Sequence, residues 1–427
     1  MSDTAKLTVG DQTIELETTV GTEGEKGIIL KPLRKTTGYI TLDPGFVNTG
    51  SAESSITYID GENGVLRYRG YAIEELVENS TFLEVCYLLM EGELPNKSEY
   101  DEFEDQITNH TLLHEDLKRM FEAFPPNAHP MAILASLVCA LSTYYQDHLD
   151  SSDPSDVQLS TRRLLAKLPT IAAWSYKRSK GQAYIYPDNT LDYCGRFLKM
   201  MFGYRTEEYV VDPDISKILD QLLILHADHE QNCSATAMRL VGSSHANLFA
   251  CVSAAVCALW GPRHGGANQR VLEMLDVIAK DNNDVDKYVR LAQDKTSDFR
   301  LMGFGHRVYK SYDPRAMFLR KSVDRVLTKL NTNDPLVNVA RRLEEHALND
   351  SYFQDRNLYP NVDFYSGIIY RALNIPTNMF TVMFAMGRLP GWIAQWKENH
   401  ANGYPIGRPR QIYTGEPARP FVSIDER

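Results

Sequence analysis

The sequence has little positive charge. Its 45 lysines and arginines stand against 56 aspartates and glutamates, which gives a formal net charge of −11 over 427 residues. A protein dedicated to binding nucleic acid normally presents a surplus of basic residues, so that class is excluded. An anionic small molecule is not excluded, because its site needs positive charge only locally.

Long hydrophobic runs and paired cysteines are also missing. The longest apolar stretch, Leu248–Trp260, is shorter than the ~20 residues of a membrane span. Residues 1–30 carry no basic start followed by an apolar run, so we expect no secretory signal. The six cysteines form no CxxC pair, which excludes the common zinc and redox motifs. We expect reduced, mostly buried thiols in a cytoplasmic protein without membrane association.

The composition that remains is typical of a folded globular protein, with 43% apolar and 24% charged residues. The length predicts two or three units of roughly 100–200 residues each. Within residues 1–70, the short apolar runs Leu7–Val9 and Thr13–Leu16 flank Gly10-Asp11, which is typical of a β-hairpin. From about Tyr71 apolar residues recur at helical spacing. We therefore predict a mainly α fold with a small N-terminal β region.

Several helix boundaries can be predicted. Two Asp-Pro steps, at 313–314 and 334–335, each place a capping carboxylate before a proline at the first helical position. Another helix is expected from Ile215 to about His226, and a further one after Asn361. Residues 246–259 alternate small and apolar side chains, which predicts a helix buried in the core or in a subunit interface.

Two histidines are embedded among glycines, His264 in PRHGG and His306 in GFGHR. Glycine lets the backbone pass close to a ligand or adopt a positive φ. A neutral imidazole can donate one N–H to a carbonyl oxygen while its other nitrogen accepts from the backbone. Either histidine alone could equally be a loop residue with a structural hydrogen bond; two in one chain favour a functional site.

Asp363 lies in the first turn of an expected helix and has two interpretations. The helix macrodipole favours a carboxylate there, and for the residue alone this is the better explanation. The alternative is a general base, since the apolar neighbours Val362 and Phe364 would raise its pKa.

His226 and His229 lie three residues apart and could hold a metal on one helical face. Their pattern, HxxHE, matches neither HExxH nor HxxEH, and no third ligand stands at a familiar spacing. Hydrogen-bond donation to a substrate carboxylate is therefore favoured over a metal-dependent hydrolase.

The GxG at 303–305 is similar to a phosphate loop, but it lacks the strand-then-helix context of a dinucleotide fold. Arginines such as Arg315 and Arg408, although usually surface charges, stand in constrained positions that suit bidentate carboxylate binding.

Six segments together resemble the signature segments of citrate synthases: ITYIDGENGVLRYRGY, LHADHEQN, WGPRHGGAN, LMGFGHRVYKSYDPRA, YPNVDFYSG and RPRQIYTG. They follow the family's order and spacing from residue 56 to the C-terminus, and they are closest to the bacterial type II enzymes. The resemblance implies a two-domain helical fold of the citrate synthase kind. It also implies condensation of acetyl-CoA with oxaloacetate and water to citrate and CoA, a step of the tricarboxylic acid cycle, with no cofactor and no metal.

The resemblance also assigns residues. Asp363 would be the base, His264 would stabilise the enol or enolate, and His306 would polarise the ketone of oxaloacetate. The residues matched to substrate binding are His229, Arg315, Phe384, Arg388 and Arg408, with Arg408 contributed by a neighbouring subunit. Those matched to CoA binding are Leu301, Gly303, Phe304, Gly305 and Lys310.

The implied organisation is a β-rich region at 1–70, a large helical domain at 71–265 and 377–427, and a small helical domain at 266–376. A homo-oligomer is implied, either a dimer or a hexamer built as a trimer of dimers. A separate NADH effector site would match His110, Tyr145, Arg163 and Lys167. The chain departs from that pattern at Asn109, where an arginine is common, and at Thr206, where some members have cysteine. Solvated helix charges remain the alternative for Arg163 and Lys167.

Three other functions stay open at this point. A 2-methylcitrate synthase would use propionyl-CoA with the same catalytic residues, although the N-terminal β region and the length favour citrate synthase. A metal-dependent hydrolase would be built on His226 and His229. A non-catalytic ligand-binding protein would leave the set of His264, His306 and Asp363 without a purpose.

Overall fold

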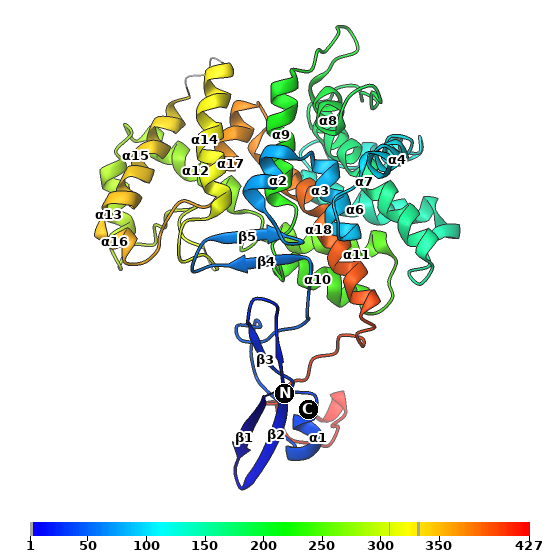
Figure 1. Ribbon diagram of the computed structural model, residues 1–427, viewed down its shortest axis with the longest axis vertical. Helices are drawn as coiled ribbons and strands as arrows, with labels where there is room; N and C mark the ends of the chain where they lie inside the picture. Colours follow the sequence, from blue (N-terminus) through cyan, green and yellow to red (C-terminus); the bar gives the residue numbers. More distant parts are fainter. Residues whose placement is uncertain (1–2, 307, 331–333) are drawn as a thin grey trace. The chain divides into compact units, whose positions relative to one another are not determined.

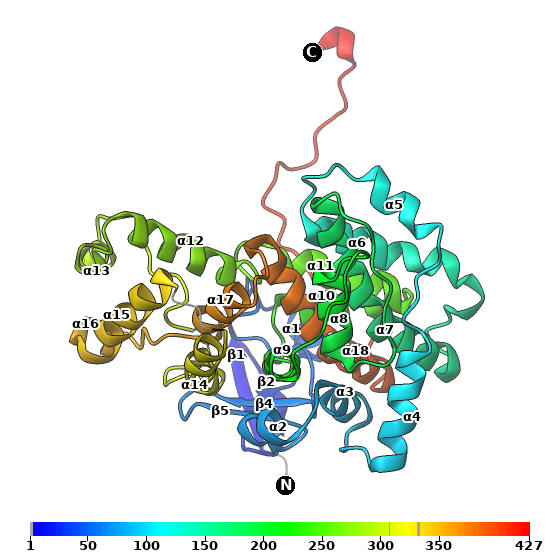
Figure 2. The same ribbon diagram turned by 90° about the horizontal axis from the view of Figure 1, so that it is seen from above.

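The computed structural model describes residues 3–306, 308–330 and 334–427, and it confirms the predicted mainly α fold with small β-sheets (Figures 1 and 2). The chain forms two compact units. One consists of the residues up to Glu53 together with Gly407–Arg427, and the other of Ser54–Ile406.

The first unit contains the predicted hairpin. Strand β1 (Thr4–Val9) pairs antiparallel with β2 (Gln12–Val20), and Val9 lies opposite Gln12 across a turn in which Gly10 has φ +59°. Strand β3 (Lys26–Ile28) adds to the other edge of β2. Helix α1 (Leu33–Thr37) supplies Leu33 to a small core with Ile14 and Leu16. The C-terminal segment ends in a 3₁₀ turn, η4 (Ile424–Glu426).

The second unit begins with a three-stranded antiparallel sheet, β4 (Thr57–Asp60), β5 (Val65–Tyr68) and β6 (Tyr71–Ala72). Its helices are, in chain order, α2 (Ile73–Asn79), α3 (Phe82–Glu91), α4 (Lys97–Thr108), α5 (Leu117–Ala123), α6 (Pro130–Leu141), η1 (Ser142–Tyr144), η2 (Gln146–His148), α7 (Pro154–Ser179), α8 (Tyr193–Phe202), α9 (Pro213–His226), α10 (Cys233–Gly242), α11 (Leu248–Leu259), α12 (Ala267–Lys280), α13 (Val285–Gln293), α14 (Pro314–Lys329), α15 (Pro335–Asn349), α16 (Ser351–Gln354), α17 (Val362–Ala372), η3 (Thr377–Met379) and α18 (Phe380–Ala401). Helices α12 to α17 lie together on one side of this unit in both views (Figures 1 and 2).

The predicted helix starts are confirmed by their caps. The Asp313 and Asp334 side chains accept backbone N–H groups at the starts of α14 and α15, each with a proline in the first turn. The Asn361 side chain caps α17 in the same way. Helix α9 begins two residues before the predicted Ile215, because the Asp212 carboxylate caps a start at Pro213. Short polar acceptors thus set the boundaries that apolar spacing alone leaves loose.

Helix α18 is buried along most of its length and packs against the end of α9. The two helices approach closely because α18 carries glycine where they meet. A Cβ on Gly387 would lie 2.9 Å from the Cβ of His226, and one on Gly391 would lie 2.1 Å from the carbonyl oxygen of Ala227. Pro390 interrupts the helical ladder, and the Gly391 N–H donates to the Ala227 oxygen at 3.1 Å. This contact sets the end of α9, and the loop that follows it, against α18.

The cysteines are all free, but the expectation that most are buried is only half right. Cys86, Cys194 and Cys251 are buried, whereas the other three are exposed on helix surfaces. In the described part of the chain, no helix combines the length and the apolar character that crossing a membrane requires.

Candidate active site

Arg388, on α18, is buried at the centre of a cluster of chemically active side chains. Its Nε donates to the carbonyl oxygen of His226 at 2.6 Å, and its Cζ lies 4.9 Å from the centre of the Phe384 ring. That ring lies 4.8 Å from the ring of His226 and 6.4 Å from the ring of His264. Burial lowers the pKa of Arg388 to about 10. The guanidinium therefore stays charged at neutral pH while bearing a desolvation cost.

His264 lies in the turn between α11 and α12, and Ser234 at the start of α10 fixes its ring. The backbone N–H of Ser234 donates to Nε2 of His264 at 3.3 Å, and the Ser234 hydroxyl lies 2.8 Å from the same nitrogen. Because Nε2 is an acceptor, the proton of the neutral ring is on Nδ1. Burial and the charge of Arg388 lower the pKa of His264 to about 4. The ring is neutral at pH 7 and can donate from Nδ1.

His306 shows the opposite tautomer. Its Nδ1 accepts the backbone N–H groups of Val308 at 3.1 Å and Tyr309 at 3.3 Å, so the proton is on Nε2. Burial and the charge of Arg315 lower the pKa of His306 to about 4. The ring lies 5.2 Å from that of His229, whose Nε2 is 3.3 Å from the Tyr309 hydroxyl. Burial and Arg315 also hold the pKa of His229 well below its ordinary value, so three neutral imidazoles stand in one site.

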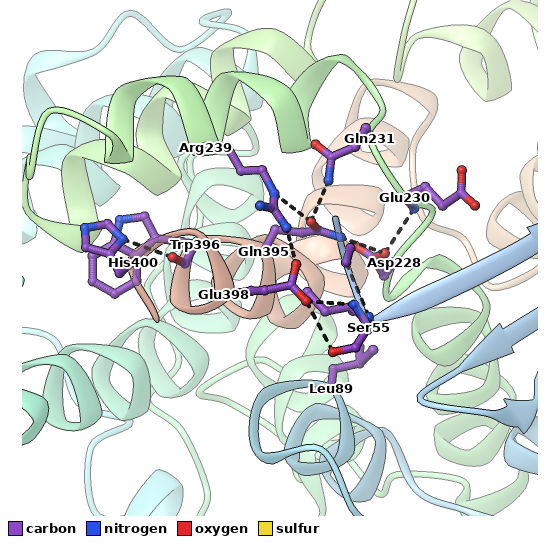
Figure 3. Close-up of polar contacts among 12 residues, drawn as sticks. Ser55, Leu89, Asp228, Glu230, Gln231, Arg239, Gln395, Trp396, Glu398 and His400 are labelled. Atoms are coloured by element: carbon purple, nitrogen blue, oxygen red, sulfur yellow. Dashed lines mark hydrogen bonds and ion pairs between the residues drawn. The ribbon is translucent and has the colours of Figure 1, made fainter. Parts of the chain in front are cut away.

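A polar network fixes the loop that carries His229 (Figure 3). The buried Asp228 carboxylate accepts from Nε2 of Gln395 at 3.3 Å. Oε1 of Gln395 in turn accepts from Gln231 at 2.7 Å and from Nε of Arg239 at 2.9 Å. Arg239 forms an ion pair with Glu398. The network joins the loop to α10 and α18, and the sequence carries no local signal for it.

Arg315 and Asp313 form a buried bidentate ion pair. Nε and Nη2 of Arg315 donate to the two carboxylate oxygens of Asp313 at 3.0 and 2.9 Å. The same carboxylate caps α14 and accepts the backbone N–H of Val362 at 3.3 Å. Burial alone would raise the pKa of Asp313, but the charge and hydrogen bonds of Arg315 bring it below its ordinary value. One carboxylate therefore links the start of α14 to the start of α17.

Asp363 is the second residue of α17, and its backbone N–H donates to the Asn361 side chain at 3.0 Å. Burial raises the pKa of Asp363 to about 6, against the charges of Arg315 and Arg388, which act to lower it. Asn361 also donates from its side chain to the carbonyl oxygen of Gly305 at 2.9 Å and from its backbone to that of Gly303 at 2.9 Å. The segments carrying His306 and Asp363 are thus joined side by side.

Residues 301–305 form a packed loop. Gly303 has φ +79°, and a Cβ there would lie 2.6 Å from Cγ2 of Val271. Phe304 packs edge-on against Phe364 with ring centres 4.9 Å apart. Leu301 is partly buried against the core, and Gly305, with φ +76°, leaves room for Leu358. Packing therefore accounts for the glycines of the GxG pattern.

The structure brings most of the expected site residues together within Ser54–Ile406. These are His229, His264, His306, Arg315, Asp363, Phe384 and Arg388. Lys310 forms an ion pair with Glu62 of the β4–β5 turn. Arg408 belongs to the other compact unit and is exposed there. Sequence reasoning missed Ser234 and Tyr309, because Ser234 meets His264, and the Tyr309 hydroxyl meets His229, only in the folded chain.

The geometry does not favour a metal centre at His226 and His229. Nδ1 of His226 donates to the carbonyl oxygen of Leu222 at 2.7 Å, and the ring is fully buried. Across the described residues, no group of three or more His, Cys, Asp or Glu side chains is arranged to hold a metal ion. A metal-dependent hydrolase at this point would lack its ligand set.

His110, Tyr145, Arg163 and Lys167 also meet. The Arg163 guanidinium carbon lies 3.9 Å from the centre of the Tyr145 ring, and Nζ of Lys167 donates to the carbonyl oxygen of His110 at 2.7 Å. Burial and the charge of Arg163 lower the pKa of Lys167 to about 8. Within the described residues, Nη1 of Arg163 is buried without a hydrogen-bond partner. This basic cluster is therefore incompletely neutralised, and it is not a set of freely solvated charges.

Comparisons with known proteins agree on one family. The family model for the C-terminal domain of citrate synthase matches residues 45–410. Citrate synthase 1 of Mycobacterium tuberculosis is 58% identical over 426 residues, which cover 100% of this chain and 99% of that protein. The citrate synthase of Corynebacterium glutamicum is 53% identical over 415 residues, covering 97% and 95%.

Two solved structures extend the likeness to the fold. The crystal structure of citrate synthase from Pyrobaculum aerophilum matches with a TM-score of 0.82 at 36% identity, over 92% of this chain and 98% of that one. The structure of citrate synthase from Thermoplasma acidophilum, solved as a ternary complex with carboxymethyl coenzyme A and oxaloacetate, matches with a TM-score of 0.82 at 26% identity, over 91% of this chain and 100% of that one.

The Asp313–Arg315 pair generates a prediction about stability. Asp313→Asn leaves a buried guanidinium without its counter-charge, which should lower the free energy of unfolding by roughly 3–5 kcal/mol. Because the folded pKa of Asp313 lies below its unfolded value, the pair stabilises fully above about pH 4, the unfolded value, and less as the pH falls through the folded pKa. Chemical denaturation at several pH values measures the difference.

Asp334→Asn is the matched control. Asp334 also caps a helix before a proline, but its partner Arg371 is partly exposed. Asparagine is as good a cap as aspartate, and a pair of this kind contributes about 0–1 kcal/mol. Equal losses in the two variants would mean that burial of the Asp313 pair carries no special weight.

Proposed function

Since the chain belongs to the citrate synthase family and is an acyl-transferring enzyme of that family, we propose that the cluster around Arg388 condenses acetyl-CoA with oxaloacetate and water to give citrate and CoA. One observation carries the proposal: a carboxyl with a raised pKa stands with two neutral histidines of opposite tautomer, among two buried arginines. The Thermoplasma acidophilum relative, solved with a CoA analogue and oxaloacetate, supports the same pair of substrates.

The proposed chemistry assigns a proton to each group. Arg315 and Arg388 bind the carboxylates of oxaloacetate, with His229 and Phe384 beside them. His306 donates a hydrogen bond from Nε2 to the ketone oxygen and so polarises it, and the one proton that this oxygen gains in citrate balances the one that Asp363 removes. Asp363 removes a proton from the thioester methyl group while the Nδ1 proton of His264 stabilises the enol or enolate. The resulting carbon attacks the ketone, and water then hydrolyses the citryl-CoA thioester.

The magnitudes make this division necessary. A thioester α-proton is too weakly acidic for a carboxylate alone, so a donor must face the developing oxyanion as the base acts. Removing one such donor typically costs about 10²–10³ in rate, and general base catalysis contributes about 10²–10⁴. Neutral histidines are suitable donors because their N–H groups stabilise negative charge as it forms, while the rings carry no charge of their own.

We also propose that residues 266–376 act as the smaller domain and move relative to the rest of Ser54–Ile406. This segment carries His306, Arg315 and Asp363, whereas His229 and Arg388 lie outside it. Binding of oxaloacetate across both parts would close the site before acetyl-CoA reacts, which protects the thioester from premature hydrolysis. The loop 301–305 and Lys310 would then contact CoA.

Asp363→Asn tests the proposal directly. It should reduce turnover by about 10²–10⁴ and leave oxaloacetate binding within about threefold, because the arginines hold that substrate. Since the base acts in its ionised form, wild-type turnover should rise with pH through about 6 and then level off. Release of free CoA measures turnover, and calorimetry measures oxaloacetate binding.

The exposed variant Asp355→Asn is the control and should behave as wild type. Turnover of Asp363→Asn within a few-fold of wild type would remove Asp363 from the role of base.

The same assay with propionyl-CoA distinguishes citrate synthase from 2-methylcitrate synthase. One methylene discriminates about 10–200-fold, and a preference for propionyl-CoA would identify a 2-methylcitrate synthase. Activity that disappears with a chelator would favour the metal-dependent alternative.

For the assembly we propose a homodimer in which Arg408 of one subunit completes the site of the other, either alone or as the unit of a hexamer. Mixing Asp363→Asn subunits with Arg408→Ala subunits should then restore activity. Each mixed dimer would hold one intact site, so about half of the wild-type rate per dimer is expected. No recovery in verified mixed dimers would contradict a shared site, and sedimentation distinguishes dimer from hexamer.

We further propose that the cluster of His110, Tyr145, Arg163 and Lys167 binds an anionic nucleotide effector such as NADH. We also expect the enzyme to be cytoplasmic, with its six cysteines reduced. The observation that favours the effector site is Nη1 of Arg163, which is buried and has no hydrogen-bond partner among the residues that the structure describes. Arg163→Gln should weaken NADH inhibition at least tenfold, whereas the exposed Lys180→Gln should not change it. An uninhibited wild-type enzyme at millimolar NADH would refute the effector role.

A further inference from the structure

The turn between β4 and β5, Asp60–Gly64, has no role in the proposed chemistry, yet it contacts the segment that follows His306. The carbonyl oxygen of Gly61 accepts the backbone N–H of Lys310 at 2.9 Å and that of Ser311 at 3.4 Å. The turn lies more than two hundred residues earlier in the chain. This contact therefore depends on the tertiary fold and not on local sequence.

Close packing leaves no room for side chains at the two glycines of the turn. A Cβ on Gly61 would lie 2.1 Å from the carbonyl oxygen of Val308, although the φ of Gly61 is not positive. A Cβ on Gly64, which has φ +69°, would lie 2.7 Å from Oγ of Ser311 and 2.8 Å from the carbonyl oxygen of Tyr312. Both glycines are thus required by the approach of the 308–312 segment.

The turn is braced independently of that segment. Oδ1 of Asp60 accepts the backbone N–H groups of Glu62 and Asn63, each at 3.0 Å, and Oδ2 accepts from the Asn63 side chain at 2.6 Å. The ion pair of Glu62 with Lys310 is a separate contact, which joins the turn to the segment. The turn therefore offers a preformed surface against which the segment can settle.

Four successive backbone N–H groups divide between two acceptors. Those of Val308 and Tyr309 donate to Nδ1 of His306, and those of Lys310 and Ser311 donate to the carbonyl oxygen of Gly61. A displacement of the second pair by a clash at Gly61 would carry the first pair away from the imidazole. The His306 ring would then lose the two donors that keep its proton on Nε2.

We propose that the Asp60–Gly64 turn is a positioning element for the active site, which fixes the 308–312 segment and, through it, the tautomer and orientation of His306. The inference rests on the proposed function only for the role of His306 toward the ketone. The link between turn and tautomer stands on the contacts alone.

Gly61→Ala tests this link, with Gly50→Ala as the matched control, because a Cβ on Gly50 meets nothing within 4 Å and its φ is not positive. In Gly61→Ala we expect kcat/KM for oxaloacetate to fall at least tenfold, with the loss mainly in kcat. Nitrogen-15 NMR of labelled histidine, assigned with His306→Gln, should show Nδ1 of His306 changing from unprotonated to partly protonated. Gly50→Ala should match wild type in both measurements.

A second variant covers the outcome in which Gly61→Ala fails to fold. Asp60→Ala removes the three braces without adding a clash, and it should shift the same NMR signal and lower kcat by about threefold. A folded variant with wild-type kinetics and an unchanged His306 tautomer would overturn the inference. A different outcome separates the two proposals. If the His306 tautomer changes in the variants but the wild-type protein does not condense acetyl-CoA with oxaloacetate, the proposed function is contradicted and the positioning role stands.

Discussion

Burial of two guanidinium charges is the constraint on which the rest of the site depends. Arg315 has a bidentate carboxylate partner, whereas Arg388 has the carbonyl oxygen of His226 and the electrostatic influence of Asp228. Two positive charges in a site of low dielectric disfavour any further positive charge nearby. Burial is the larger cause of the lowered pKa values of the neighbouring histidines, and the arginine charges add to it, so each histidine can be a neutral donor at physiological pH.

Neutral histidines are useful only if the correct nitrogen carries the proton, and the backbone makes that choice. Ser234 presents an N–H to Nε2 of His264, and the turn after His306 presents two N–H groups to Nδ1. Backbone donors cannot rotate away or change their protonation state. The two rings are thus held as opposite tautomers by the same kind of contact, from segments that are unrelated in sequence.

Sequence reasoning reached the parts of this arrangement that have local causes. The helix starts at Asp313, Asp334 and Asn361 follow from short-range capping, and the structure confirms them. The glycine-embedded histidines were recognisable as candidates, but their neighbours gave no hint of which nitrogen would be free. That property depends on Ser234, which stands thirty residues from His264 and reads as an ordinary helix-start serine.

Long-range contacts explain what else the sequence could not supply. The Asp-Pro step predicted Asp313 as a cap, yet the same carboxylate also pairs with Arg315 and accepts the N–H of Val362. Similarly, the glycines of the GxG pattern suggested a phosphate loop, whereas Val271 and Leu358 occupy the space beside them. A sequence motif shows which residue stands at a position. The packing partner that requires this residue is seen only in the folded chain.

The net charge of the whole chain and the buried charges of the site are separate matters. A net charge of −11 describes the surface that the whole protein presents to solvent, but the site is governed by the few charges that cannot reach solvent. Among the described residues Arg388 forms no ion pair with a carboxylate, and burial lowers its pKa to about 10. In the proposed function, a dicarboxylate entering the site would supply the missing counter-charge, and its binding would relieve the desolvation cost of the buried guanidinium. If the proposal holds, carboxylate recognition and the stability of the buried arginine are one electrostatic problem, since the same counter-charge would serve both.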